Sequence, residues 1–221
     1  DVSAEAGLEY ALIDEGWSTN NARGQGDLRE IKQGVDLPGI LAHARAKGVK
    51  VWLWAHWEGV DRHMDEVFAN FEKWGVAGVK IDFMDRDDQW MVGFYHRAAE
   101  AAAKHKLLLD VHGACKPTGL SRTWPNVLTY EGGLGLEYLK WSARVTAGHN
   151  THLAFTRLLA GPFDYTPGGF HNVEPAEFIP RRVEPMVPHT RAHQLALLVV
   201  FESAFVMLAD YPGAYRGQKE L

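Results

Sequence analysis

The sequence predicts an α/β fold, namely a (β/α)8 TIM barrel that lacks its first β/α unit, and three observations support this prediction. Short apolar runs alternate with helical patterns, which is typical of βα units around a parallel sheet. Seven such runs occur, one fewer than a complete barrel of about 250 residues contains. No Gly-rich phosphate-binding loop follows any run, so a doubly wound open sheet is the weaker alternative.

The predicted strands are rich in leucine, β-branched and aromatic residues and are bounded by turn-forming residues. We predict strands at residues 8–17, 49–57, 78–85, 106–114, 126–132, 162–166 and 205–210. Apolar residues at helical spacing predict helices at 38–48, 61–75 and 88–105. For the second of these, Asp61 is the expected N-cap and Gly75 the expected end.

Length and composition favour an ordinary globular protein. The 221 residues are 46% hydrophobic and 23% charged, which is enough apolar surface for a sizeable core. Lys and Arg number 23 against 28 Asp and Glu, with no basic stripe, so nucleic acid is not an expected partner. No apolar run reaches the roughly 20 residues of a membrane-spanning helix. Oligomeric state is left open.

Domain organisation is predicted to be simple. We see no linker or repeat before residue 171, so residues 1–221 are expected to form one partial barrel domain. The Pro-rich stretch 174–188 is expected to be a functional loop. The first residues run directly into a strand without a signal-peptide pattern, which is expected of the interior of a longer gene product. The single cysteine, Cys115, has no intrachain disulfide partner and is expected to be a loop thiol.

Polar residues close every predicted strand, at the end where barrels carry their active sites. They are Asp14, Glu15, His56, Glu58, Asp82, Asp85, Asp110, His112, Glu131, Glu137, Asp164 and Asp210. Any single one can be a helix cap or a surface ion pair, which is the alternative for Asp85, Asp87, Asp88, Asp164 and Asp210. Five tryptophans accompany them: Trp17, Trp52, Trp54, Trp57 and Trp124. Acidic side chains can cleave a glycosidic bond, and aromatic faces can pack on pyranose rings. The two together point to a sugar site.

The segment GVKIDFMD is the most informative. Side chains alternate along a strand, so Lys80 and Asp82 are predicted to share one face, and Ile81 and Phe83 the other. A cation beside Asp82 would favour the ionised carboxylate that a nucleophile requires. The alternative is a structural ion pair inside the barrel.

Several segments, taken in order, resemble the catalytic barrel of glycoside hydrolase family 97. They are ALIDEGW, GVKVWLWAHW, GVKIDFMDRDDQWMVGFYH, KPTGLSRTWPN, NVLTYEGGLGLEY and FTRLLAGPFDYTPGGF, and they extend from about Tyr10 to Pro212. The resemblance implies a bacterial exo-acting α-glycosidase, periplasmic or extracellular, with a calcium ion at its active site. It also implies β-sandwich domains on both sides of the barrel, which residues 1–221 do not include.

Two positions separate the subgroups of that family. Inverting members carry a glycine where Asp82 stands and a glutamate where Gly113 stands in HGACKPTG. The resemblance therefore implies a retaining enzyme, most simply an α-galactosidase, with Asp82 as nucleophile and Glu137 as general acid/base. It also implies Glu131 and Glu137 as calcium ligands. Calcium is expected in the full-length protein rather than in this fragment, because Gly113 supplies no ligand.

The remaining polar residues receive supporting roles. Lys80, Asp14, Trp17, His56 and His112 are candidates for contacts with sugar hydroxyls, and a purely structural role is the alternative for each. Arg122 is expected to brace the loop that carries the two glutamates.

The sequence thus predicts a retaining exo-α-glycosidase, most simply an α-galactosidase, that takes an oligosaccharide or other α-galactoside as substrate. The alternatives are an α-glucosidase of the same family, a barrel fragment that binds carbohydrate without cleaving it and, more remotely, a metal-dependent barrel hydrolase or aldolase. Carboxyl groups about 5–5.5 Å apart would fit retention, and about 6.5–9.5 Å would fit inversion.

Overall fold

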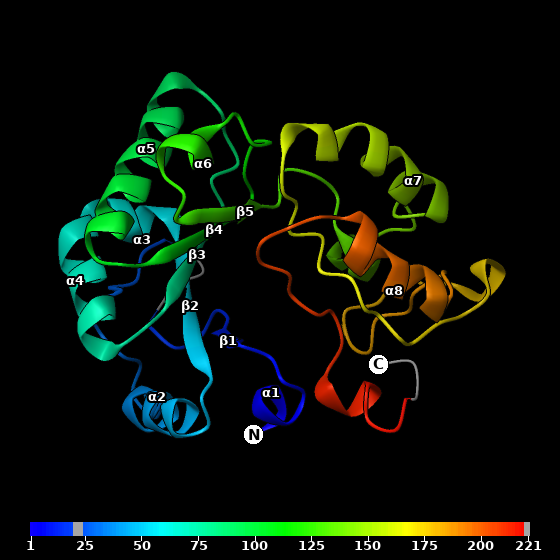
Figure 1. The fold of residues 1–221 in the computed structure, drawn as a ribbon, viewed down its shortest axis with the longest axis horizontal. Helices are drawn as coiled ribbons and strands as arrows, with labels where there is room; N and C mark the ends of the chain where they lie inside the picture. The colour runs from blue at the N-terminus through cyan, green and yellow to red at the C-terminus, as the bar shows by residue number, and fades with distance from the viewer. Residues whose placement is uncertain (20–23, 219–221) are drawn as a thin grey trace. The chain divides into compact units, whose positions relative to one another are not determined.

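A computed structural model describes residues 1–19 and 24–218 and divides the chain into two compact units (Figure 1). Unit 1 comprises Asp1–Cys115 and Leu120–Leu128, and unit 2 comprises Lys116–Gly119 and Thr129–Leu221. Each unit is described in turn. The organisation of residues 1–221 as one domain stays a prediction.

Unit 1 is built on a sheet whose strands follow one another in chain order, β1-β2-β3-β4-β5. The strands are β1 (Tyr10–Ile13), β2 (Lys50–His56), β3 (Gly78–Asp82), β4 (Leu108–Val111) and β5 (Val127–Tyr130). Neighbouring strands from β1 to β4 pair in parallel. At β5 the Leu109 N–H donates to Asn126 O at 2.8 Å. The sheet confirms five of the seven predicted strands, each shorter than its prediction.

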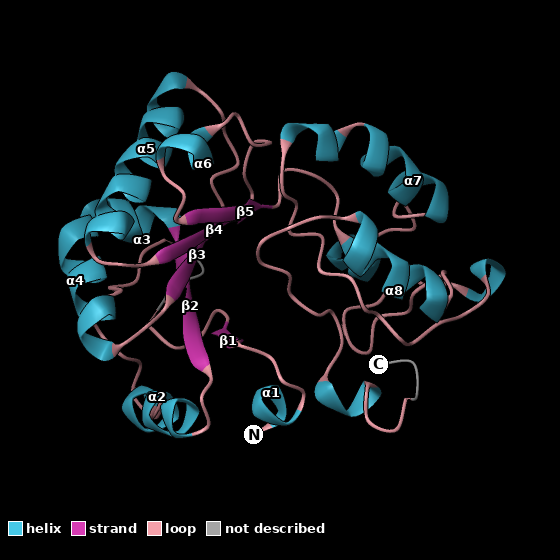
Figure 2. Ribbon diagram, in the orientation of Figure 1, coloured by secondary structure: helices cyan, strands magenta, loops and turns pink. Residues whose placement is uncertain are grey.

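Helices precede and connect the strands of unit 1. They are α1 (Val2–Glu5), α2 (Leu37–Ala46), α3 (Trp57–Arg62), α4 (Met64–Trp74), α5 (Gln89–Lys104) and α6 (Leu120–Thr123). Figure 2 shows α3, α4 and α5 on one side of the strands. This alternation of strand and helix confirms the α/β class. Within the described ranges, no helix combines the length and apolarity needed to span a bilayer.

The predicted helix at 61–75 is two helices. The backbone breaks at His63, where φ is −143°, so Asp61 lies inside α3 and the prediction that it is an N-cap was wrong. Gly75, with φ of 81°, ends α4 as predicted, because glycine adopts the left-handed conformation at little cost. Asp88 caps α5 by accepting a hydrogen bond from the Met91 N–H at 3.0 Å, whereas Asp85 lies outside the cap.

Strands β2, β3 and β4 are mostly buried, whereas β1 is half-buried. Every residue of β2 after Lys50 is buried, as expected for a parallel strand covered on both sides. Trp52 is fully buried, and a Cβ on Gly78 of the neighbouring strand would lie 2.5 Å from its ring. Glycine at position 78 therefore makes room for the Trp52 indole inside the sheet.

Unit 2 has short helices and long loops. Its elements are η2 (Leu136–Lys140), α7 (Ala147–Phe155), η3 (Arg157–Ala160), η4 (Pro175–Glu177), α8 (Arg191–Val200) and η5 (Pro212–Ala214). They surround a core of Leu136, Leu139, Val145, Leu153, Phe163, Tyr165, Val187, Leu197 and Phe201. The rings of Phe163, Tyr165 and Phe201 contact one another in this core. The Tyr165 and Phe201 rings meet edge to face, with 5.0 Å between their centroids.

The predicted strands at 162–166 and 205–210 do not form, and these two predictions were wrong. Residues 162–166 have no strand assignment: the Asp164 N–H donates to Tyr130 O at 2.8 Å, and the Leu136 N–H donates to Tyr165 O at 3.0 Å. Asp210 accepts a hydrogen bond from the Phe170 N–H at 2.7 Å, so it braces a loop and caps no helix. The stretch 174–188 is loop apart from η4 and an isolated bridge at Val187, and its functional role stays a prediction. Cys115, in unit 1, is a half-buried free thiol.

Candidate active site

The register of unit 1 places polar side chains in two layers at the ends of its strands. Trp54 is the partner of Lys80, His56 is the partner of Asp82, and Lys80 is the partner of Asp110. Because alternate residues of a strand share a face, all five project from the same face of the sheet. The register therefore agrees with the prediction that Lys80 and Asp82 lie on one face of the strand.

Asp82, the last residue of β3, is held through both carboxylate oxygens. Oδ2 accepts a hydrogen bond from Trp54 Nε1 at 2.9 Å, and Oδ1 accepts one from the Phe83 N–H at 2.6 Å. Trp54 is only 2% exposed, so water does not compete for its indole N–H. The two donors fix the orientation of the half-buried carboxylate. Sequence reasoning treated Trp54 as a sugar-packing ring and missed this role.

Lys80 forms an ion pair with Asp14. Lys80 Nζ lies 3.5 Å from Asp14 Oδ2. The lysine side chain is 10% exposed and the aspartate side chain 59%. The partnership joins the ends of β1 and β3 and leaves the Asp14 carboxylate accessible. Both residues thus lie at strand ends, as the sequence predicted.

His56 ends β2, and its ring accepts a hydrogen bond. Burial lowers the pKa of His56 below its ordinary value. Its Nδ1 accepts a hydrogen bond from the Glu58 N–H at 3.2 Å, which caps α3. A neutral imidazole that accepts through Nδ1 carries its proton on Nε2. The His56 ring also stacks on Trp57 at 6.3 Å.

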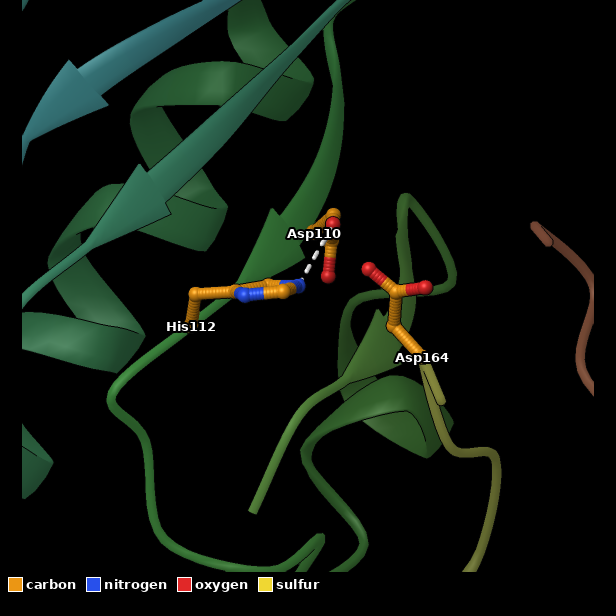
Figure 3. A group of neighbouring side chains, drawn as sticks. All are labelled: Asp110, His112 and Asp164. Carbon is orange, nitrogen blue, oxygen red and sulfur yellow. Dashed lines mark ion pairs between the residues drawn. The ribbon is translucent and has the colours of Figure 1, made fainter. Parts of the chain in front are cut away.

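His112 follows β4 and pairs with a buried acid. Its Nε2 lies 3.4 Å from Asp110 Oδ2 (Figure 3). Asp110 is fully buried and His112 is 5% exposed. A carboxylate that contacts one ring nitrogen fixes the orientation of the imidazole. His112 is therefore a rigid side chain at the strand end.

Phe83 lies on the opposite face from its prediction. The strand ends at Asp82, and Phe83 has a φ of 65°, so alternation stops there. Its ring instead contacts the rings of Trp54 and His56, with centroids 5.8 and 5.5 Å away. The side chain is 45% exposed. An apolar ring therefore stands beside Asp82.

The predicted sugar contact of Trp17 does not fit its position. Trp17 is 1% exposed, its Nε1 donates to Trp54 O at 2.8 Å, and its ring packs edge to face on Phe71 and Trp74. The cause is that β1 ends at Ile13, so its alternation does not extend to residue 17. Trp52 and Trp54 are equally buried, and these three tryptophans form core rather than a sugar platform.

Unit 2 carries the two glutamates. Glu131 directly follows β5, and Glu137 lies in η2. Glu137 Oε1 accepts a hydrogen bond from Lys140 Nζ at 3.1 Å, and its side chain is 44% exposed. A general acid has to carry a proton, which burial or a neighbouring anion favours, whereas Lys140 is a cation. Asp164, also drawn in Figure 3, is buried and caps no helix.

Arg157 holds the backbone around Glu131. Its guanidinium donates to the backbone oxygens of Tyr130, Glu131, Gly132, Gly161 and Pro162 at 3.0–3.1 Å. Arg157 is 7% exposed and lies over the Phe163 ring at 4.7 Å. Sequence reasoning assigned this bracing role to Arg122, which is exposed. Backbone oxygens leave no signature in a sequence, so Arg157 could not be found from its partners.

Calcium takes six to eight oxygen ligands. Glu131 and Glu137 offer carboxylates, but Glu137 is paired with Lys140. Among residues 1–19 and 24–218, no cluster of three histidine, cysteine or acidic side chains suited to a metal includes either glutamate. The two residues alone do not fit a calcium site, and calcium stays a prediction.

Carboxylates at the C-terminal ends of parallel strands are typical of barrel glycoside hydrolases. The family model described as Glycoside hydrolase 97 matches residues 1–133. The match covers more than half of the chain, and the chain therefore belongs to glycoside hydrolase family 97. The resemblance found in the sequence is confirmed.

Curated relatives share this family. The "Retaining alpha-galactosidase" of Bacteroides thetaiotaomicron is 44% identical over 222 residues, covering 100% of this chain and 33% of the relative. The "Probable retaining alpha-galactosidase" of Streptomyces bingchenggensis is 35% identical over 220 residues, covering 97% of this chain and 32% of the relative. The chain thus spans about a third of the length of these relatives.

Solved structures agree with the fold. A glycoside hydrolase family 97 enzyme from a Pseudoalteromonas species has a TM-score of 0.87 at 30% identity, covering 100% of this chain and 37% of that one. Structures of that enzyme exist in complex with panose and with acarbose. A β-arabinopyranosidase has a TM-score of 0.80 at 21% identity, covering 97% of this chain and 35% of that one, which speaks for the fold alone. The chain is part of a (β/α)8 barrel catalytic domain.

Proposed function

We propose that the chain supplies the nucleophile and the general acid of a retaining exo-acting α-galactosidase. The observation that carries the proposal is the Asp82 carboxylate, held by two hydrogen bonds at the end of β3 in a chain 44% identical to a retaining α-galactosidase. A nucleophile needs a fixed orientation, because attack requires alignment with the anomeric carbon.

The reaction would proceed in two displacements. An Asp82 oxygen attacks the anomeric carbon while the glycosidic bond breaks, and Glu137 gives its proton to the departing oxygen. Glu137 then takes a proton from water, whose oxygen attacks the anomeric carbon and releases Asp82. Lys140 contacts Glu137 and has to leave that carboxyl before Glu137 acts as an acid.

The other strand-end residues would position the sugar. His56 offers an Nε2–H donor, Asp14 an accessible carboxylate, and Lys80 holds Asp14 through their ion pair. His112, fixed by Asp110, would contact a further hydroxyl. The substrate class proposed is an oligosaccharide or other α-galactoside. The panose and acarbose complexes of the Pseudoalteromonas relative support an oligosaccharide ligand.

Two measurements on the full-length gene product test this function. Hydrolysis of p-nitrophenyl α-galactoside should exceed that of the α-glucoside, and the reverse order would favour the α-glucosidase alternative. NMR should show the α-anomer of the sugar as the first product. Initial release of the β-anomer would rule out Asp82 as a nucleophile.

A third measurement isolates Asp82. Asp82→Ala should abolish turnover, and added azide should restore it with formation of a glycosyl azide, since azide fills the space of the missing carboxylate. Asp87→Ala, an exposed acid nearby in sequence, is the matched control and should keep full activity. Galactose binding without turnover in the wild type would favour a carbohydrate-binding protein.

Calcium and location remain parts of the proposal. We propose that the full-length protein binds calcium with Glu131 and Glu137 among the ligands, and metal analysis of wild type against Glu131→Gln tests this. The proposed location is the periplasm or the outside of a bacterial cell, which cell fractionation tests.

A further inference from the structure

Phe83 has a backbone conformation that is costly for its side chain. Its φ of 65° lies in the left-handed region, which bulky side chains avoid because Cβ approaches the carbonyl oxygen. The ring is also 45% exposed, although it is apolar. Residues held in sparsely populated conformations cluster at functional sites. Folding alone gives no reason for a strained and half-exposed phenylalanine.

The surroundings enforce this conformation. The backbone N–H of Phe83 donates to Asp82 Oδ1 at 2.6 Å, and the Asp85 N–H donates to Gly113 O at 2.7 Å. A Cβ on Gly113 would lie 3.0 Å from Phe83 Cα and 3.1 Å from Phe83 N. Glycine at position 113 therefore admits the backbone of Phe83 at close range. These contacts constrain the backbone of the loop after β3.

The ring of Phe83 is supported by two buried aromatic side chains. It meets the Trp54 ring at 5.8 Å and 79°, and the His56 ring at 5.5 Å and 39°. Both supporting residues are buried, and Trp54 also holds Asp82. The exposed part of the phenyl group is thus a rigid apolar surface one residue from the carboxylate.

We propose that Phe83 is a substrate-contacting residue that packs against the C–H face of the sugar unit bound at Asp82. The inference rests on the proposed function and adds a specificity determinant to it. In a galactosyl unit the axial O4 leaves the hydrogens of C3, C4 and C5 as one apolar patch, and an aromatic side chain suits such a patch. The strained backbone places the ring where ordinary alternation would have turned it away.

Replacement of the ring should weaken binding without loss of stability. In Phe83→Asn the ring is removed and asparagine tolerates the left-handed conformation. We expect KM for p-nitrophenyl α-galactoside to rise about tenfold or more, with kcat within about twofold, because the contact acts equally on bound substrate and transition state. In an Asp82→Asn background, calorimetry should show the Kd of methyl α-galactoside rising by a similar factor. The melting temperature should stay unchanged or increase.

Three further variants of the full-length protein serve as controls. Phe83→Tyr keeps the ring and should retain the wild-type KM. Phe83→Leu keeps apolar bulk without a ring and should raise KM, which preserves the test if Phe83→Asn does not fold. Lys106→Asn relieves a similar strain, φ of 56°, in the loop before β4, and should leave KM unchanged.

The outcomes separate the inference from the function on which it rests. If the wild type cleaves α-galactosides and neither Phe83→Asn nor Phe83→Leu changes KM or Kd, the inference is wrong and the function stands. A fall in melting temperature for all three Phe83 variants, with KM unchanged, would assign Phe83 to packing. A wild type that neither binds nor cleaves α-galactosides would overturn both.

Discussion

Asp82 in unit 1 and Glu131 in unit 2 both stand at the end of a strand, and different groups hold them. Asp82 is held by side-chain and backbone donors that act on its own carboxylate. Glu131 is held through its backbone, whose oxygen shares the Arg157 guanidinium with four others. The first arrangement follows from sheet register, which repeats along the chain. The second depends on a single residue 26 positions away.

Because of this difference, we expect substitutions at the two places to act on different properties, activity for one and stability for the other. Substitutions around Asp82 should act mainly on catalysis, because the register of a five-stranded sheet survives the loss of one side chain. Substitution of Arg157 should act mainly on the folding of unit 2, because five backbone acceptors lose their donor together. Four predictions test the comparison, from the largest expected effect to the smallest.

Arg157→Met should have the largest effect. We expect the free energy of unfolding to fall by about 3–5 kcal/mol, because buried carbonyl oxygens lose charged donors. Urea denaturation followed by circular dichroism measures this. Arg122→Met, an exposed arginine, should change stability by less than about 0.5 kcal/mol. Equal losses in the two variants would show that Arg157 does not support the loop after β5.

Trp54→Phe should act on catalysis. The variant keeps an aromatic ring and loses the hydrogen bond to Asp82 Oδ2. A hydrogen bond to a charged group contributes about 1.5–3 kcal/mol, so kcat/KM should fall about 10–100-fold. Trp17→Phe, which removes the donor to Trp54 O, should instead cost about 1–3 kcal/mol of stability. If Trp17→Phe lowered kcat/KM as much as Trp54→Phe, the proposed role of the Trp54 N–H would fail.

His189 should make unit 2 sensitive to acid. Burial lowers the pKa of His189 to about 4, and the charge of His193 makes the second largest contribution in the same direction. Between about pH 6.5 and pH 4 the unfolded chain binds a proton that the folded unit does not, so stability is lost as pH falls. We expect a loss of about 1–2 kcal/mol between pH 7 and pH 5.

Urea denaturation at the two pH values measures this loss. His189→Gln should reduce the pH dependence, whereas the exposed His152→Gln should retain it. An unchanged slope in His189→Gln would assign the acid sensitivity to other groups.

Gly113→Ala should have a small effect on stability. Its φ of 54° disfavours alanine, and the new Cβ would meet Phe83 Cα at 3.0 Å. We expect a loss of about 1–2 kcal/mol together with lower activity. Gly48→Ala has a φ of 76° with nothing within 4 Å of the new Cβ, so it carries the conformational cost alone. Equal losses, with activity intact in both, would show that Gly113 does not shape the loop beside Asp82.

The sequence predicted the regular parts of unit 1. Strand β2 is an apolar run from Val51 to Ala55 because these residues are buried, and alternation along β3 placed Lys80 and Asp82 on one face. The prediction failed for 162–166 and 205–210. Residues such as Phe163 and Tyr165 are apolar because they fill an aromatic core, and periodicity does not separate such loops from strands.

The site was predictable only where a pattern repeats. Alternation failed at Phe83, because one positive φ reverses the face and leaves no mark in composition. It failed at Trp17, which lies beyond the end of β1. Arg157 acts on backbone oxygens, which every residue carries, so its role was open only to the structure.

The Trp52 ring fills the space that a side chain at position 78 would occupy, so each position restricts the residues that the other tolerates. A Cβ at position 78 would lie 2.5–2.7 Å from the Trp52 ring, so even alanine requires the indole to move. In a saturation mutagenesis screen, position 78 should therefore accept glycine alone while Trp52 is present. Larger residues at 78 should be recovered only together with a smaller residue at 52. The strand that presents Asp82 begins with a position whose allowed residues are set by its neighbour.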